Sequence, residues 1–270
     1  MPQGSPEGSQ RLRRIHLFAP GGDRAQQVKD RLTRMLETAG LELVDEPQGP
    51  DDLVITLGGD GTFLEALRRY GRVDPVFCGI NAGNLGFLQE IDSDNLVPAV
   101  ERILQGRYAI SRHGLLTVDP VGGEAFNDVV VERSDTRALR LVLRVDGQEL
   151  GPVIADGVLV ATPMGSTAYA LAAGGAVVQP GADVLQILVI NAHPSRLTRV
   201  LTAPLIVPGD AVVDVEIDWH RRRQPRLVID GSEAPLEPGT HVRIRTGERA
   251  VRVLRLGLLG FWERLRAKFG

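Results

Sequence analysis

The chain has 270 residues, of which 43% are hydrophobic and 24% are charged, so its composition is that of a folded globular protein rather than a disordered or fibrous one. Its 31 basic and 34 acidic side chains give a net charge of -3, which disfavours nucleic acid and membrane surfaces as partners. The sequence has no apolar run of about eighteen residues and no apolar stretch of a secretory signal near its start. We therefore expect a cytoplasmic protein.

The first part of the chain alternates apolar strands with helical patterns. A Gly-, Ser- and Pro-rich flexible tail is expected over residues 1–12. The strands expected after it are residues 15–19, 41–44, 53–57 and 75–80, and the expected helices are residues 23–39 and 62–70. Strands that alternate with helices predict an α/β domain with a parallel sheet, over residues 13–108. The only cysteine, Cys78, lies in the last of these strands and is expected to be a small buried hydrophobe.

The second part of the chain, residues 109–256, is predicted to be a mainly-β, sandwich-like domain. Its apolar segments are short, and Gly and Pro residues separate them. The expected strands are residues 114–118, 127–132, 138–145, 153–162, 185–190, 211–217, 226–229 and 241–245.

An amphipathic helix is expected over residues 257–270. One face of this helix would carry Leu258, Phe261, Trp262, Leu265 and Phe269, and the other face would carry Glu263, Arg264, Arg266 and Lys268. We expect the apolar face to dock back on the protein or on a sister subunit.

The segment GGDGT at residues 58–62 follows a predicted strand and precedes a predicted helix. Glycines let the backbone approach phosphate oxygens closely, and amides at a helix N-terminus favour negative charge. We therefore predict that Gly58, Gly59, Gly61 and Thr62 bind the phosphates of a phosphoryl donor. The alternative is a tight turn in which Asp60 caps the helix that begins at Thr62.

Asp60 is the candidate general base, because it is the acidic residue of this loop and phosphoryl transfer needs a group that takes a proton from the attacking hydroxyl. A divalent metal such as Mg²⁺ would shield the carboxylate from the donor, and Mg²⁺ needs few protein ligands. The sequence does not identify those ligands. Because no Lys-Ser or Lys-Thr follows the last glycine, the loop is not a Walker A motif.

Together with GGDGT, three further segments resemble the ATP-NAD kinase family: NLGFL at 84–88, FNDVVVER at 126–133 and DGVLVATPMGSTAYALAAGG at 156–175. GGDGT alone is also similar to loops of lipid kinases and phosphofructokinases, whereas the combination selects NAD. The resemblance implies an enzyme that phosphorylates the adenosine ribose 2′-hydroxyl of NAD with ATP or polyphosphate and a divalent metal. It also implies a homodimer or homotetramer.

The resemblance gives Asp60 the catalytic role and implies a set of NAD-binding residues. This set is Asp60, Gly61, Phe87, Asn127, Asp128, Asp156, Thr167, Ala168, Tyr169 and Ala172. The residues themselves suit these roles: Asn127 and Asp128 are polar groups at a strand start that could bind ribose hydroxyls, although an Asx turn is the alternative. Thr167 is expected to cap a short helix, and Tyr169 could stack on a base.

Asp128 replaces the Glu usual in the family, Met164 stands where Thr is common, and Ala172 replaces a frequent Ser. Two other functions remain open at this point. A lipid kinase could use the same glycine loop, and a non-catalytic sensor could bind NAD without phosphorylating it. The five histidines lack the spacing of metal ligands, and the run at 221–223 is expected to be a solvated turn.

Overall fold

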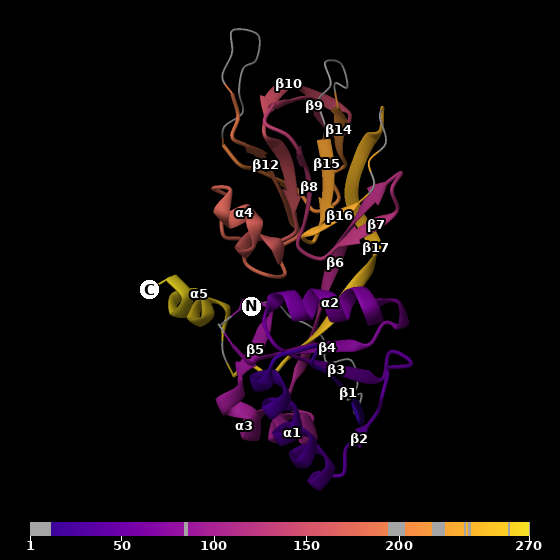
Figure 1. Ribbon diagram of the computed structural model, residues 1–270, viewed down its shortest axis with the longest axis vertical. Coiled ribbons are helices and arrows are strands. Elements are labelled where there is room, and N and C mark those ends of the chain that lie inside the picture. Colours follow the sequence, from indigo (N-terminus) through magenta and orange to yellow (C-terminus); the bar gives the residue numbers. More distant parts are fainter. Residues whose placement is uncertain are drawn as a thin grey trace. The chain divides into compact units, whose positions relative to one another are not determined.

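The computed structural model describes residues 12–83, 86–193, 203–217, 225–234, 236, 239–258 and 260–269 (Figure 1). Predictions for residues 1–11, 84–85 and 220–223 concern positions outside these ranges. The chain forms two compact units, Met1–Arg112 with Val251–Gly270, and His113–Ala250. It passes from one unit to the other within two strands, β6 (Ala109–Asp119) and β17 (His241–Arg255).

The first unit contains a parallel sheet. Its strand order is β17-β4-β3-β1-β2, and β5 also pairs with β4. The bounds of its own strands are Arg14–Phe18 for β1, Glu42–Leu43 for β2, Asp52–Leu57 for β3, Val76–Asn81 for β4 and Gln89–Asp92 for β5. Strands β3 and β4 are buried along their whole length, as expected for parallel strands that are covered on both faces. The predicted α/β domain is confirmed, and Cys78 in β4 is buried.

Helices cover both faces of this sheet (Figure 1). On one face, α1 (Asp23–Thr38) and α3 (Leu96–Leu104) share a hydrophobic core with alternate residues of β1 and β3. On the other face lies α2 (Asp60–Tyr70), where the ring of Phe63 packs 5.8 Å from that of Phe77 in β4. Helix α3 and strand β5 were not predicted from the sequence.

The second unit is built from strands of two sheets. One has the order β13-β12-β11-β8-β15-β16 and antiparallel pairs, and the other contains β10-β9-β14-β17, also antiparallel, with β6 and β7. Val129 and Val158 of the first sheet belong to the same core as Leu141 and Val215 of the second. The predicted mainly-β, sandwich-like domain is therefore confirmed. The bounds are Gly123–Ala125 for β7, Asp128–Arg133 for β8, Leu139–Val145 for β9, Gln148–Ala155 for β10, Gly157–Ala161 for β11, Val184–Ile190 for β12, Leu205–Pro208 for β13, Val213–Ile217 for β14, Pro225–Ile229 for β15 and Ser232–Ala234 for β16.

The predicted strand at 153–162 is wrong as a single strand. The chain leaves β10 at Ala155 and enters β11 at Gly157, and these two strands belong to different sheets. A Cβ atom at Gly157 would lie 2.5 Å from the carbonyl oxygen of Val131, so only glycine permits this close approach. Asp156 stands at the point where the chain changes sheet.

The C-terminal helix α5 (Phe261–Phe269) differs from its prediction in the face that it buries. Within this helix the buried side chain is Arg264, whereas Trp262 and Phe269 are 58% and 59% exposed. The expectation that Arg264 lies on the solvent face is therefore wrong, because its guanidinium bonds to buried acceptors in β5. The longest helix of the described chain has sixteen residues, and none has both the length and the apolar character that crossing a membrane requires.

Candidate active site

The glycine loop connects β3 to α2 and presents an open surface. A Cβ atom at Gly58 would lie 2.3 Å from Oγ1 of Thr62, so this glycine is required by packing within the loop. By contrast, no atom lies within 4 Å of the positions that Cβ atoms would take at Gly59 and Gly61. The first amides of a helix have no intrahelical acceptor, and here they belong to Asp60 and Gly61. This arrangement can accept phosphate oxygens.

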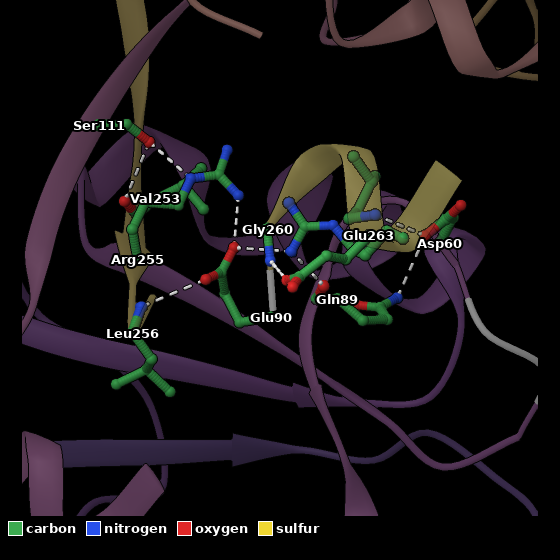
Figure 2. Close-up of polar contacts among 11 residues, drawn as sticks. Asp60, Gln89, Glu90, Ser111, Val253, Arg255, Leu256, Gly260 and Glu263 are labelled. Carbon is green, nitrogen blue, oxygen red and sulfur yellow. Dashed lines mark hydrogen bonds and ion pairs between the residues drawn. The ribbon is translucent and has the colours of Figure 1, made fainter. Parts of the chain in front are cut away.

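Asp60 is the first residue of α2, and its carboxylate is held by three donors. Oδ2 accepts a hydrogen bond from the amide of Phe87 at 3.1 Å, and Oδ1 accepts one from the amide of Leu88 at 2.9 Å. The side-chain amide of Gln89 donates to Oδ1 at 3.3 Å, a contact visible in Figure 2. The alternative reading of Asp60 as a helix cap is wrong, because Gly59 is the N-cap and the carboxylate bonds to another segment.

The segment that donates to Asp60, Phe87–Gln89, is preceded by a glycine that lies very close to the carboxylate. A Cβ atom at Gly86 would lie 2.1 Å from Oδ1 of Asp60, so the contact requires glycine at this position. Phe87 is 5% exposed, and its ring stacks on that of Phe269 at a centroid distance of 5.9 Å. The ammonium of Lys268 lies 4.5 Å from the centre of the same ring. The structure thus brings together Asp60, Gly61 and Phe87 of the predicted site within the first unit.

In the second unit, Asn127 and Asp128 lie where β8 begins and are 7% and 5% exposed. The carboxylate of Asp230 accepts hydrogen bonds from the amides of Phe126, Asn127 and Asp128 at 2.7, 2.7 and 3.2 Å. Among the described residues, Oδ1 of Asn127 is buried and has no hydrogen-bond partner, so it does not form the acceptor of an Asx turn. A buried acceptor without a donor costs free energy, and a ligand hydroxyl could supply that donor.

Asp128 has an unusual protonation equilibrium. Burial raises the pKa of its carboxyl group to about 7, and the negative charge of Asp230 contributes to the same shift. Near neutral pH the group is therefore divided between a protonated form that donates a hydrogen bond and an ionised form that accepts one. Either form can bind a hydroxyl group.

The bend after β11 packs directly on this pair. Thr162 donates from its hydroxyl to the carbonyl of Phe126 at 2.6 Å and from its amide to the carbonyl of Asn127 at 2.9 Å. A Cβ atom at Gly165 would lie 2.0 Å from that same Asn127 oxygen, so the bend needs glycine there. The bend is followed by a short 3-10 helix (Gly165–Thr167) and by α4 (Tyr169–Ala172).

The prediction that Thr167 caps the short helix is wrong. Thr167 ends the preceding turn, and its hydroxyl donates to the carbonyl of Met164 at 3.4 Å, while the N-cap of α4 is Ala168. The N-cap of the helix therefore lies one residue later than predicted.

Asp156 and Tyr169 line one cavity of about 360 Å³ in the second unit. Asp156 forms an ion pair with Nε of Arg133 at 2.6 Å and accepts a hydrogen bond from Asn191 at 3.0 Å. The hydrogen bond from Asn191, followed by those from Arg133, lowers the pKa of Asp156, so it is ionised. Tyr169 is 42% exposed, and burial raises the pKa of its hydroxyl. Three other predicted residues, Thr167, Ala168 and Ala172, are not among those that line this cavity.

Asp230 is the functional candidate that sequence reasoning missed. It lies in an Asp-Gly turn between β15 and β16, and both turn residues have positive φ, 46° and 74°. The Asp-Gly pair after a strand is a hairpin signal that the sequence contains. However, no local pattern indicates that this carboxylate binds amides about a hundred residues earlier. The described residues contain no group of three or more His, Cys, Asp or Glu side chains that could hold a metal.

Comparison with protein families places the chain in a known group. The sequence model of the family described as ATP-NAD kinase N-terminal domain matches residues 42–108. The sequence model described as ATP-NAD kinase C-terminal domain matches residues 126–256. A protein named NAD kinase from Methanopyrus kandleri is 35% identical over 91% of this chain and 93% of its own length. A second NAD kinase, from Corynebacterium glutamicum, is 39% identical over 80% of this chain and 76% of its own length.

Two solved structures share the fold. Yeast NADH kinase in complex with NADH has a TM-score of 0.80 at 22% identity, and it matches 97% of this chain and 90% of its own. An NAD kinase from Archaeoglobus fulgidus in complex with ATP has a TM-score of 0.74 at 24% identity, and it matches 95% of this chain and 97% of its own.

Proposed function

Because the chain belongs to the ATP-NAD kinase family and is therefore a kinase that acts on NAD, we propose that it uses Asp60 to activate the 2′-hydroxyl of the adenosine ribose. The product of this reaction is NADP. The phosphoryl donor is ATP or polyphosphate, because a backbone loop recognises phosphates rather than a base.

The observation that carries this proposal is the fixed carboxylate of Asp60 beside an open glycine loop. Three donors orient the carboxylate, so it does not have to be ordered when the substrate arrives. An ionised carboxylate in this position can accept the proton of an attacking hydroxyl. Gly59 and Gly61, at the open side of the loop, would approach the donor phosphates most closely. We assign the same role to Gly58 and Thr62, although their own amides donate to the carbonyls of Ile80 and Gly59.

A divalent metal fits this arrangement. Asp60 is the carboxylate within the loop, and the described residues offer no cluster of three ligands, so most ligands of Mg²⁺ would come from phosphate oxygens and water. Bound there, the ion would neutralise negative charge on the donor. Asp60 would remain the group that receives the proton.

The residues of the second unit would bind NAD through polar groups that the fold leaves available. Asn127 offers its unpartnered Oδ1 and Asp128 its half-protonated carboxyl group to ribose hydroxyls. Tyr169 offers an exposed ring beside the charge of Asp156. We assign the same NAD-binding role to the remaining predicted residues, which are Gly61, Phe87, Thr167, Ala168 and Ala172.

The direct test is formation of NADP by the purified protein from NAD and Mg²⁺, with ATP and with polyphosphate in parallel. Product with either donor supports the proposal and identifies the donor. Binding of NAD without product from any donor would contradict it and favour a sensor. Phosphorylation of diacylglycerol in place of NAD would favour a lipid kinase. Light scattering on the same sample would test the expected homodimer or homotetramer, and fractionation would test the cytoplasmic location.

A further inference from the structure

A buried carboxylate connects the end of the chain to β5. Glu90 is 2% exposed, and its Oε1 accepts a hydrogen bond from Arg255 at 2.6 Å. Oε2 of the same group accepts the amide of Leu256 at 3.2 Å. Arg264 of α5 approaches Oε1 at 3.4 Å, so two arginines share one carboxylate; the contact from Arg255 to Glu90 is drawn in Figure 2. The cluster has one positive charge in excess.

Arg264 is the anchor of α5. It is 5% exposed, and its Nη1 also donates to the backbone carbonyl of Gln89 at 3.2 Å. Burial lowers the pKa of its guanidinium, and the neighbouring Glu90 opposes that shift. Removing an arginine from water is costly unless it is paired, so α5 can hold this position only with its partners in place.

The partners of Arg264 are adjacent to the residues that hold Asp60. Gln89 accepts from Arg264 through its backbone and donates to Asp60 through its side chain. At the other end of the same segment, the amide of Phe87 donates a hydrogen bond to Asp60, and the ring of Phe87 stacks on the ring of Phe269. Helix α5 therefore contacts both ends of the three-residue segment whose donors orient the carboxylate.

Phe87 and Leu88 belong to no helix or strand, and β5 begins only at Gln89. The orientation of Phe87 and Leu88 is therefore set by their contacts with Asp60 and helix α5, and not by the backbone hydrogen bonds of a β-sheet. Gly86 adds conformational freedom immediately before them. Loss of the α5 contacts would leave Asp60 bonded to a segment that can move.

We propose that Arg264 is a positioning residue, which fixes the Phe87–Gln89 segment and through it the carboxylate of Asp60. The proposal rests on the proposed role of Asp60 as the base, but its structural part, the ordering of the segment, can be measured separately. It adds the C-terminal helix to the machinery of phosphoryl transfer without placing it in contact with the reacting atoms.

The test compares three full-length variants with the wild type. Arg264→Met removes the charge and the donors, Arg264→Lys keeps the charge, and Arg266→Met changes an exposed arginine of the same helix. For each protein we would measure kcat and KM for NAD, together with hydrogen exchange of the Phe87 and Leu88 amides by NMR. Amides of β4 serve as an internal reference for global opening.

In Arg264→Met, kcat should fall about tenfold to a hundredfold with little change in KM, since small misplacements of a catalytic group have effects of this size. The Phe87 and Leu88 amides should exchange about tenfold faster, as expected for loss of a charge-assisted hydrogen bond. Arg264→Lys should lie between this variant and the wild type, and Arg266→Met should match the wild type.

Wild-type exchange of both amides in Arg264→Met would overturn the proposal, as would an equal loss of kcat in Arg266→Met. If Arg264→Met does not fold, the same two amides in Arg264→Lys decide the question: faster exchange there supports the proposal and unchanged exchange contradicts it. If the wild type forms no NADP, the proposed function fails, while the exchange measurement still decides whether Arg264 orders the segment.

Discussion

The amide of Asn127 donates a hydrogen bond of 2.7 Å to the carboxylate of Asp230, although 103 residues separate them in the chain. Asp230 returns a second connection, because its own amide donates to the carbonyl of Asp128 at 3.0 Å. The turn at Asp230 therefore bonds to both the amides and a carbonyl group at the start of β8. Asn127 and Asp128 owe their position to this turn.

Asp230→Asn should destabilise the protein and weaken NAD binding. An amide oxygen is a weaker acceptor than a carboxylate and would serve three backbone donors, so we expect a loss of about 1–3 kcal/mol in the free energy of unfolding. Chemical denaturation and calorimetric titration with NAD would measure the two effects. Asp210→Asn, at an exposed turn of the same unit, is the matched control and should change neither quantity. Equal stability of the two variants would argue against this role of Asp230.

Asp128 should make the stability of the protein depend on pH. Its pKa in the folded state is about 7, above the ordinary aspartate value of 3.8, so between these values the folded state binds more protons than the unfolded state. The contribution of this group to the free energy of unfolding is therefore present at low pH and is lost as the pH rises through 7. Its carboxyl group is more stable in the fold when protonated.

Asp128→Asn removes this titration. The stability of the wild type relative to the variant should fall between about pH 5 and about pH 8, as measured by denaturation at both values. A difference that stays constant over this range would show that Asp128 does not titrate there. Asp210→Asn, which removes an exposed carboxyl group and keeps Asp128, again provides the control.

Gly86→Ala should impair catalysis more than folding. The added methyl group would lie 2.1 Å from Oδ1 of Asp60. Because the clash is with a side chain and not with the backbone, the Asp60 carboxylate can move aside and the fold can be kept. We expect kcat to fall by about tenfold or more, because the carboxylate is displaced from its orientation. Gly83→Ala is the control, since no atom lies within 4 Å of its added methyl group. Similar kcat values for the two variants would contradict the predicted role of the close approach.

Much of the fold could be predicted from local sequence patterns. The mainly apolar runs that became β3 and β4 are typical of parallel strands, and the Gly-rich segment after β3 marked the turn into α2. The break at Asp156 was missed because residues 153–162 form a nearly continuous apolar run across it. Periodicity does not reveal a strand that changes sheet when the residues on both sides are apolar.

The site was predictable where its residues are adjacent in sequence and not where they meet through the fold. The pair Asn127 and Asp128 is visible as two polar residues before an apolar strand. Arg264, in contrast, is part of a helix pattern in which arginine normally faces water. Its burial depends on Glu90, which lies 174 residues away, and nothing local to either residue indicates the contact.

Asp60 is proposed to take the proton from the 2′-hydroxyl of NAD. We would measure kcat and the dissociation constant for NAD in Asp60→Asn, with Asp23→Asn, at the first residue of helix α1, as the matched control. We expect Asp60→Asn to lower kcat by about 10²- to 10⁴-fold and to leave NAD binding nearly unchanged. Turnover in Asp60→Asn close to that of the wild type would contradict this role of Asp60.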